Sequence, residues 1–372
     1  MIRARLRKSR HAMNKLILGL CVWLAAASVP VAAGTMYLGA YPDEILAFDE
    51  SNGTLKQKLK LPNGLPTSMR LSNDEKLLYV TTITTSGIDV IDVATRKVVS
   101  SMSLNTPTEK YRFFGGVPDP TGRYFYTMAT KIEKQADRYV IGKPQFLVID
   151  LKQKKIARSR DLDDEDDTGG YRNGFMLSED GKTLYLLRDK VLVVNTADLK
   201  VAERFDLAKP ELAGMENINF GGGVQSMRSP REFVSLFNAT DPYIHNKTFG
   251  IARLNLATRE FTFTPIGPAP SAMTGLEVTP DGKEGYTVVT NGTLGNKRCE
   301  FWRFDLANNV VLGRAEFECR SRFSFGMSGD GSKLYIYGAS FDIEVYDART
   351  LKFEKKWDLG SDVTMAGMVI TN

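Results

Sequence analysis

Short runs of alternating apolar and polar residues make up most of the chain. One stretch is typical: LLYVTT (77–82) is rich in β-branched and aromatic residues, GIDVIDV (87–93) alternates apolar and polar positions, and a turn at 94–96 leads into a Val-rich run. Alternation points successive side chains to opposite faces of a sheet, and no run has the period or length of a helix. With TSMRL (67–71) before it, four antiparallel strands fit into about 40 residues, the size of one propeller blade.

The same unit recurs along the chain. The turn before the second strand reads LSNDEK, DPTGR, LSEDGK, TPDGK and SGDGSK in different copies. Each third strand ends in an apolar run followed by Asp or Asn, whose side chain bonds to nearby backbone amides in a tight turn. These end positions are Asp49, Asp92, Asp150, Asn195, Asn255, Asp305 and Asp347. Their spacings of 43, 58, 45, 60, 50 and 42 residues predict seven repeats.

The two ends of the repeat array complement each other. TMYLGAY (35–41) and EILAFDE (44–50) have the pattern of second and third strands, and SDVTMAGMVITN (361–372) that of a lone first strand. Pairing them completes one blade and removes open sheet edges. We therefore predict an all-β fold over residues 34–372: a seven-bladed β-propeller of four-stranded antiparallel blades, closed by the C-terminal strand pairing with the N-terminal blade.

Residues 1–33 have the composition of a secretory signal peptide. A basic segment is followed by the apolar run LILGLCVWLAAASV and by VAA before Gly34, which predicts cleavage near Ala33 and a periplasmic or secreted protein. Met1 and Met13 are both possible starts. Cys21 follows Leu20, whereas lipoprotein processing needs a small residue there. No later segment is long enough to span a membrane.

The charge of the full chain is dominated by this N-terminal segment. It contains six of the 49 Lys and Arg and none of the 44 Asp and Glu. The remaining chain carries 43 basic and 44 acidic residues, so bulk charge gives it no reason to bind nucleic acid.

Two cysteines remain after the signal segment, Cys299 and Cys319. Their midpoint is Asn309, in the turn between a third and a fourth strand, so folding the hairpin there sets them opposite each other within disulfide reach. An exported chain with one such pair should be oxidised. We expect a structural disulfide worth roughly 3 kcal/mol.

Recognisable catalytic or cofactor motifs are missing. After the signal segment the only histidine is His245, and there is no C-x-x-C-H haem attachment, nucleophile elbow or P-loop. The acidic run DLDDEDDTGG (161–170) offers oxygens for Ca²⁺ but lacks the EF-hand spacing, which favours a solvated loop. We predict no metal site.

Three arginines recur at matching positions. Arg112, Arg172 and Arg322 precede the blade turn by 10 or 11 residues, so each enters an innermost strand at the same end of the ring. Each has aromatic neighbours, which are Tyr111, Phe113, Tyr171 and Phe323. They predict a channel mouth that binds an anion or an acidic partner. The alternative is ordinary ion pairs at the rim.

Two blades carry insertions between the second and third strands. KIEKQADRYVIGKPQ (131–145) and NATDPYIHNKTFG (238–250) should emerge on one face, where binding loops are often placed on a rigid scaffold. Tyr243 and His245 in the second insertion are candidate binding residues.

The strand pattern YVTT…IDVIDVATRKVV resembles the YVTN-type propeller repeat of exported bacterial proteins. The segments 104–155, 238–261 and 333–359 also resemble the β-subunit of quinohaemoprotein amine dehydrogenase and, more distantly, the heavy chain of methylamine dehydrogenase. The resemblance implies a propeller without a catalytic residue or cofactor of its own. Haem c and a tryptophan-derived quinone would then be on partner subunits. The cysteine pair departs from that family pattern.

Two functions follow as expectations. The first is a non-catalytic scaffold subunit of a periplasmic complex of the amine dehydrogenase kind, with an apolar patch on one face. The second is a free-standing exported propeller that binds a small anion or a protein partner. A lactonase-like hydrolase is a third, weaker alternative, which would require carboxylates and Asn converging on the axis. Fold alone does not decide between them.

Overall fold

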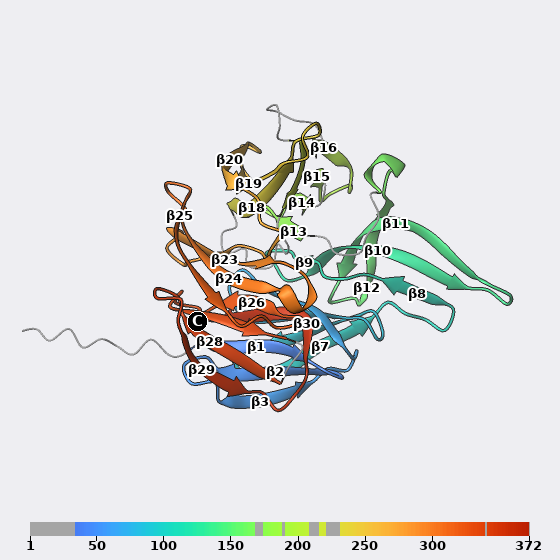
Figure 1. The fold of residues 1–372 in the computed structure, drawn as a ribbon. Coiled ribbons are helices and arrows are strands. Elements are labelled where there is room, and N and C mark those ends of the chain that lie inside the picture. The colour runs from blue at the N-terminus through green and yellow to red at the C-terminus, as the bar shows by residue number, and fades with distance from the viewer. Residues whose placement is uncertain are drawn as a thin grey trace, which may run out of the picture. The chain divides into compact units, whose positions relative to one another are not determined.

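Seven antiparallel four-stranded blades form a propeller ring (Figure 1). The computed structural model describes residues 34–167, 174–187, 190–207, 216–220, 231–338 and 341–371. The fold class predicted from the repeats is confirmed. The proposed signal peptide, residues 1–33, lies outside the described residues. Within them, no helix is long and apolar enough to cross a membrane.

The first four blades use the strands below, named from the centre of the ring outwards. Blade 1 consists of β30 (Val363–Thr371), β1 (Thr35–Ala40), β2 (Glu44–Asp49) and β3 (Leu55–Lys60). Blade 2 consists of β4 (Pro66–Leu71), β5 (Leu77–Thr82), β6 (Gly87–Asp92) and β7 (Lys97–Ser103). Blade 3 has a first strand in two pieces, β8 (Glu109–Arg112) and β9 (Val117–Pro118), then β10 (Tyr124–Lys134), β11 (Tyr139–Asp150) and β12 (Lys155–Asp161). Blade 4 consists of β13 (Gly174–Leu177), β14 (Thr183–Leu187), β15 (Lys190–Asn195) and β16 (Val201–Asp206).

The remaining three blades follow the same order. Blade 5 consists of β17 (Glu216–Phe220), β18 (Glu232–Thr240), β19 (Lys247–Asn255) and β20 (Phe261–Pro268). Blade 6 has a first strand in two pieces, β21 (Ala272–Met273) and β22 (Glu277–Val278), then β23 (Glu284–Asn291), β24 (Arg298–Asp305) and β25 (Val310–Phe317). Blade 7 consists of β26 (Ser324–Met327), β27 (Lys333–Tyr337), β28 (Asp342–Asp347) and β29 (Phe353–Asp358). Two short 3₁₀ helices, η1 (Asp164–Asp166) and η2 (Leu294–Asn296), lie between strands.

The ring closes in blade 1, as predicted. The C-terminal β30 pairs antiparallel with β1, with Thr371 opposite Thr35 and Val369 opposite Tyr37. Blade 1 is thus built from both ends of the described chain. Its backbone hydrogen bonds join residues more than 300 positions apart, so the ring cannot open without breaking a sheet.

The hydrophobic core lies between neighbouring blades. In β5, Leu78 and Val80 pack toward blade 1, whereas Tyr79 packs toward blade 3, because successive strand residues face opposite ways. The division repeats around the ring, and a last cluster joins Tyr335 of blade 7 to Met36 of blade 1. Burying one such side chain contributes roughly 1.5–3 kcal/mol. Each blade is therefore stabilised mainly by its two neighbours.

The Asp and Asn residues that mark the repeats begin the turns to the fourth strands. In every blade the side-chain oxygen accepts a backbone N–H two or three residues later, as Asp92 does from Thr95 at 2.7 Å. The residue four positions after the mark has a positive φ in every blade. These residues are Gly53, Arg96, Lys154, Leu199, Arg259, Asn309 and Leu351. The predicted role of the marks is confirmed.

In several blades a polar side chain contacts the marked turn of the next blade around the ring. In four of them a side chain donates to the carbonyl of the residue directly after the mark. The pairs are Tyr37 with Val93, Arg158 with Thr196, Tyr185 with Leu256, and Arg253 with Leu306. We call this the inter-blade hydrogen bond. It fixes the turn of one blade against the strands of the blade before it.

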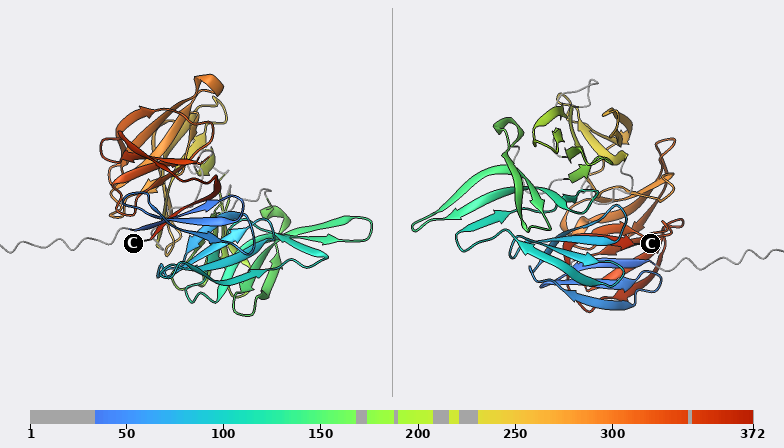
Figure 2. Two further views of the ribbon diagram at one scale, coloured as in Figure 1. Left: turned by 90° about the horizontal axis from the view of Figure 1, so that it is seen from below. Right: turned by 180° about the vertical axis from the view of Figure 1, so that it is seen from behind.

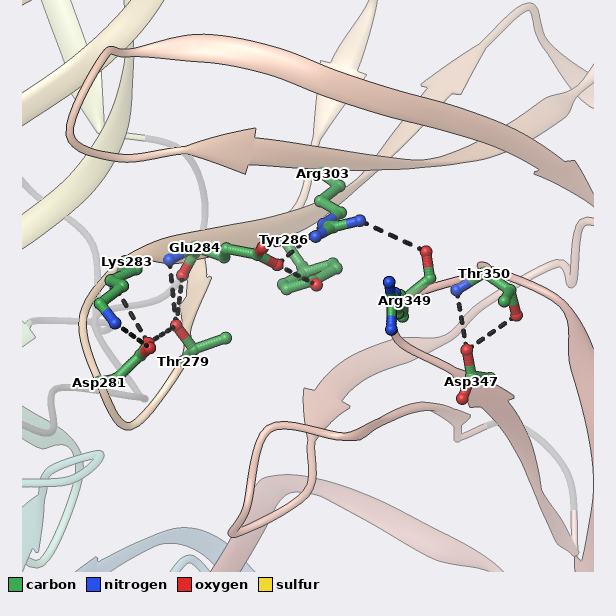
Figure 3. Close-up of polar contacts among 9 residues, drawn as sticks. All are labelled: Thr279, Asp281, Lys283, Glu284, Tyr286, Arg303, Asp347, Arg349 and Thr350. Atoms are coloured by element: carbon green, nitrogen blue, oxygen red, sulfur yellow. Dashed lines mark hydrogen bonds and ion pairs between the residues drawn. The ribbon is translucent and has the colours of Figure 1, made fainter.

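Related contacts join the last blades. Arg303 donates from Nη1 to the carbonyl of Arg349 at 3.4 Å, and its Nε bonds to Glu284 at 2.8 Å (Figure 3). Tyr335 donates to Glu50 of blade 1 at 3.4 Å. Among the described residues the hydroxyl of Tyr79 has no hydrogen-bond partner, so blades 2 and 3 lack this contact. Burial raises the pKa of Tyr79 to about 12.

The two insertions form hairpins, and the first is mostly strand where we expected a loop. Strand β10 continues to Lys134 and β11 begins at Tyr139, with Ile132 opposite Ile141. Figures 1 and 2 show this hairpin, coloured cyan to green, extending beyond the other strands of its blade. The alternating β-branched and aromatic residues in the insertion favour continued pairing over an irregular loop.

The predicted disulfide between Cys299 and Cys319 is present, with Cα atoms 5.2 Å apart. The expected register is wrong. Cys299 lies opposite Phe317, and Cys319 follows the end of β25 by two residues. The turn is centred between Ala307 and Asn308, earlier than Asn309, and a bulge between Arg303 and Phe304 recovers only one residue of this offset, so Cys319 lies two residues beyond the partner of Cys299. The bond therefore ties β24 to the segment that leads into blade 7.

The marked turns predict a specific response to acid. Hydrogen bonds from Thr95 and Asn308 hold the pKa of the Asp92 and Asp305 carboxyls below the ordinary value. Their stabilising effect is therefore complete above the unfolded-state pKa of about 4 and is lost as the pH falls toward the lower folded-state pKa. The double variant Asp92→Asn/Asp305→Asn keeps a side-chain acceptor in each turn but cannot titrate.

We expect its unfolding free energy, measured by urea denaturation from pH 5 to pH 2.5, to fall less steeply than that of the wild type. Asp137→Asn, in the exposed β10–β11 turn, serves as the control and should follow the wild type. If the double variant matches the wild-type slope, these turns do not carry the acid sensitivity.

Candidate functional site

The loops of the ring lie on two faces. In a four-stranded antiparallel blade, the turns between first and second and between third and fourth strands lie at one end, and the loop between second and third strands lies at the other. We call these ends the turn face and the 2–3 face. The hairpins β10–β11 and β18–β19 both belong to the 2–3 face.

Exposed aromatic side chains mark the 2–3 face. Tyr41, Tyr139, Tyr243 and Phe341 lie in or at the ends of the second-to-third connections of blades 1, 3, 5 and 7, and are 63%, 68%, 88% and 59% exposed. In the two long hairpins they have apolar neighbours, Ile141 and Ile244, that are also exposed. Large aromatic side chains left in water on rigid hairpins are typical of surfaces that bind another molecule.

The turn face has the opposite character. Its turns carry short-range ion pairs, such as Lys182 with Asp180 at 3.6 Å and Lys283 with Asp281 at 3.4 Å. Asp281 also accepts from Thr279, as Figure 3 shows. Of the other exposed large apolar residues of the described chain, Val140 belongs to the β10–β11 hairpin, and the rest lie on fourth strands: Leu55, Val99, Val310, Leu312 and Phe353. Among the described residues, the exposed aromatic loops are thus found on one of the two faces.

The channel-mouth arginines are only partly described. Arg112 ends β8, as expected for an innermost strand, and its guanidinium lies 5.4 Å from the ring centre of Phe114. Arg322 is exposed and precedes β26 by two residues. Arg172 and Tyr171 lie outside the described residues. No described contact brings Arg112 and Arg322 together, so the three-arginine site stays a prediction.

Two of the aromatic neighbours have other roles. Phe113 is only 2% exposed and packs in the core between blades 2 and 3, so it is buried away from any ligand. Phe323 packs beside the disulfide and its ring faces the Lys297 ammonium at 5.2 Å. Tyr111 is half-buried at the edge of the same core as Phe113. Sequence proximity placed these rings beside the arginines, but Phe113 follows the end of β8 and lies in the core between blades 2 and 3.

Tyr243 and His245 lie where the insertion predicted them. Both are exposed in the turn between β18 and β19, and the His245 amide donates to the Asp241 carbonyl at 2.9 Å. His245 has a positive φ of 56°, a conformation that fits a tight turn. The imidazole thus belongs to the rim of the 2–3 face.

Sequence reasoning missed several residues at both faces. Tyr41, Tyr139 and Phe341 stand out only by their exposure in the folded ring, because single exposed aromatics carry no sequence signal. Arg70, on the innermost strand β4, was also missed. Its Nη2 donates to the carbonyl of Phe175 in β13, two blades further on. Only ring closure brings these segments together.

The acidic run is neutralised by an arginine. Asp163, Glu165 and Asp166 surround Arg204 of β16, with N–O distances of 3.2, 3.2 and 2.8 Å. The Asp166 side chain is fully buried, and its carboxylate accepts from both Nε and Nη2 of Arg204 at 2.8 Å. These carboxylates are the one triad in the described chain close enough to share a metal ion. The guanidinium already supplies the positive charge that a bound cation would bring, so the three carboxylates are neutralised by Arg204 itself.

Replacing this arginine should create a dependence on calcium. Arg204→Gln leaves the buried Asp166 carboxylate without its partner, which should cost about 3 kcal/mol of unfolding free energy. Ca²⁺ should raise the melting temperature of the variant but not that of the wild type. Lys200→Gln, at an exposed position just before β16, should behave like the wild type. Stabilisation of the wild-type protein by Ca²⁺ would show that the acidic run binds a metal despite Arg204.

Comparisons with known proteins support the fold. No protein-family model and no curated protein matches the chain. Apo AztD from Citrobacter koseri is similar at 12% identity, with a TM-score of 0.52 over 92% of this chain and 98% of that one. A putative 6-phosphogluconolactonase from Bacteroides fragilis has 13% identity and a TM-score of 0.53 over 93% and 99%. Dihydro-haem d1 dehydrogenase NirN in complex with DHE has 13% identity and a TM-score of 0.53 over 91% and 75%. At these identities the likeness extends to the seven-bladed β-propeller fold alone.

Proposed function

We propose that this protein is a scaffold propeller that docks another protein on its 2–3 face. The observation that carries the proposal is the set of exposed aromatic side chains Tyr41, Tyr139, Tyr243 and Phe341 on that face. Tyrosine and phenylalanine provide large contact areas with few rotatable bonds, so ordering them on binding costs little entropy. Among the described residues, the charged turn face has no comparable set of exposed aromatic side chains.

The hairpins are suited to this role mechanically. Tyr139 and Ile141 lie near the end of β10–β11, which a third strand, β8, braces through pairs such as Ile132 with Lys110. Lys131 of the hairpin also bonds to Glu109 of β8 at 2.6 Å. A braced hairpin presents its side chains in a fixed arrangement, which lowers the entropic cost of docking.

The resemblance supplies the finer part of the proposal. A propeller similar to the β-subunit of quinohaemoprotein amine dehydrogenase would carry no cofactor itself. Its partners would be a haem-bearing chain and a small chain with a tryptophan-derived quinone. Such a complex would be periplasmic, and the Cys299–Cys319 disulfide fits an oxidising compartment.

Site-specific photo-crosslinking in the native cells tests the docking face. A benzoylphenylalanine residue at position 139 or 243 should form an adduct with the same partner chain, because both positions project from the 2–3 face. The matched controls are positions 99 and 353, where Val99 and Phe353 are similarly exposed on fourth strands. They should give no adduct with that chain.

Two outcomes separate the coarse proposal from the fine one. The proposal of a docking face would be contradicted if position 353 formed the adduct as efficiently as positions 139 and 243, or if those two positions formed none. If positions 139 and 243 alone form an adduct, and the partner chain carries no haem, the result would support the docking face and contradict the amine dehydrogenase assignment.

A further inference from the structure

Arg70 lies at the centre of the ring. It is on β4, the innermost strand of blade 2, opposite Tyr79. Its Nη2 reaches the carbonyl of Phe175 in blade 4, so the side chain passes the inner edge of blade 3. Among the described strands β13 pairs only with β14, which leaves carbonyls on its other edge directed toward the axis. The guanidinium of Arg70 therefore lies at the inner edges of blades 2 to 4, beside the axis of the ring.

The charge of Arg70 has no anionic partner among the described residues. Its one hydrogen bond goes to a neutral carbonyl, and no described carboxylate lies within ion-pair distance. By contrast, Arg204, Arg303 and Arg320 each contact at least one carboxylate. A buried cation without a counter-ion is costly, and burial lowers the pKa of Arg70 to about 10. The side chain stays charged at neutral pH.

The side chain is both enclosed and reachable. Arg70 keeps part of its surface accessible, although protein atoms surround its guanidinium closely enough to desolvate it. Partial accessibility and close enclosure by protein are expected together for a side chain that faces the axis of the ring. Two residues upstream on the same face of β4, the Ser68 hydroxyl lies 3.2 Å from where a Cβ on Gly115 would be. The glycine keeps that part of the wall free of a side chain.

We propose that Arg70 anchors a small oxyanion, a carboxylate or a phosphate, inside the central channel. A guanidinium has five N–H donors, and one is used by Phe175, so a planar edge is left for two parallel hydrogen bonds to oxygen atoms. Ser68 adds a neutral hydroxyl to the same wall. Strand β4 runs from Pro66 to Leu71 into a turn of the turn face, so Arg70 is near that mouth of the channel. The site is separate from the docking face and does not depend on it.

Anion binding by the purified protein tests the proposal. The probes are inorganic phosphate, acetate and oxalate, each added at constant ionic strength set with chloride, and the readouts are calorimetric affinity and melting temperature. At least one probe should bind and raise the melting temperature of the wild type. Arg70→Gln should weaken that binding about tenfold or more, since it removes a charge-assisted pair of hydrogen bonds. Phosphate and the carboxylates serve as separate arms, so the result identifies the class of oxyanion.

Two further variants make the outcome decisive. Arg70→Lys keeps the positive charge but lacks the planar edge, so it should bind the anion with intermediate affinity. This variant takes the place of Arg70→Gln in the test if Arg70→Gln fails to fold. Arg138→Gln, an exposed arginine in the β10–β11 turn, should bind like the wild type. In chloride alone Arg70→Gln should be at least as stable as the wild type, because an uncompensated charge is gone.

Three results would overturn the proposal. The first is a wild type that binds none of the probes. The second is equal binding by the wild type and Arg70→Gln. The third is a loss of stability in Arg70→Gln that is the same in every salt, which would make the bond to Phe175 a structural tie between blades 2 and 4.

Discussion

Packing of each blade against its two neighbours is the interaction on which the ring depends, and the inter-blade hydrogen bond fixes that packing at four of the junctions. The Asp or Asn at the end of a third strand folds the following turn, and the carbonyl just after it accepts from a side chain of the previous blade, as Val93 does from Tyr37. Local turn chemistry and long-range packing thus meet at two adjacent residues at these four junctions. Pairing of β30 with β1 then closes the circle, and each core layer is held between two fixed neighbours.

A ring built in this way separates its two faces chemically. The turn face is occupied by the repeated polar turns that define the blades, so its sequence is constrained by folding. The 2–3 connections do not define the blades in this way, and they range from short connections such as that between β1 and β2 to a braced hairpin in blade 3. Exposed aromatics such as Tyr243 are found on this unconstrained side. This division would let one scaffold carry the proposed docking surface without disturbing its own core.

The fold was readable from the sequence because its signals are local and repeated. Seven Asp or Asn marks and the two chain ends predicted the blades and the closure. Cys299 and Cys319 were paired correctly, but their register depended on where the hairpin turns and on a bulge, which composition does not encode. Phe113 adjoins Arg112 in the sequence but is buried, because β8 ends at Arg112 and the next side chain packs between blades 2 and 3. Arg70 was missed because its partner, Phe175, comes close only after the ring has formed.

The central claim is that the aromatic loops of the 2–3 face hold a partner chain. The most direct test is mild affinity purification of the tagged chain from its native cells, followed by size-exclusion chromatography with visible absorption. The account predicts that the wild type elutes in a larger assembly, with haem absorption if the amine dehydrogenase assignment holds. The variant Tyr139→Ser/Tyr243→Ser/Phe341→Ser should elute as a folded, colourless single chain. A wild type that elutes alone, or a triple variant that keeps its partner, would contradict the claim.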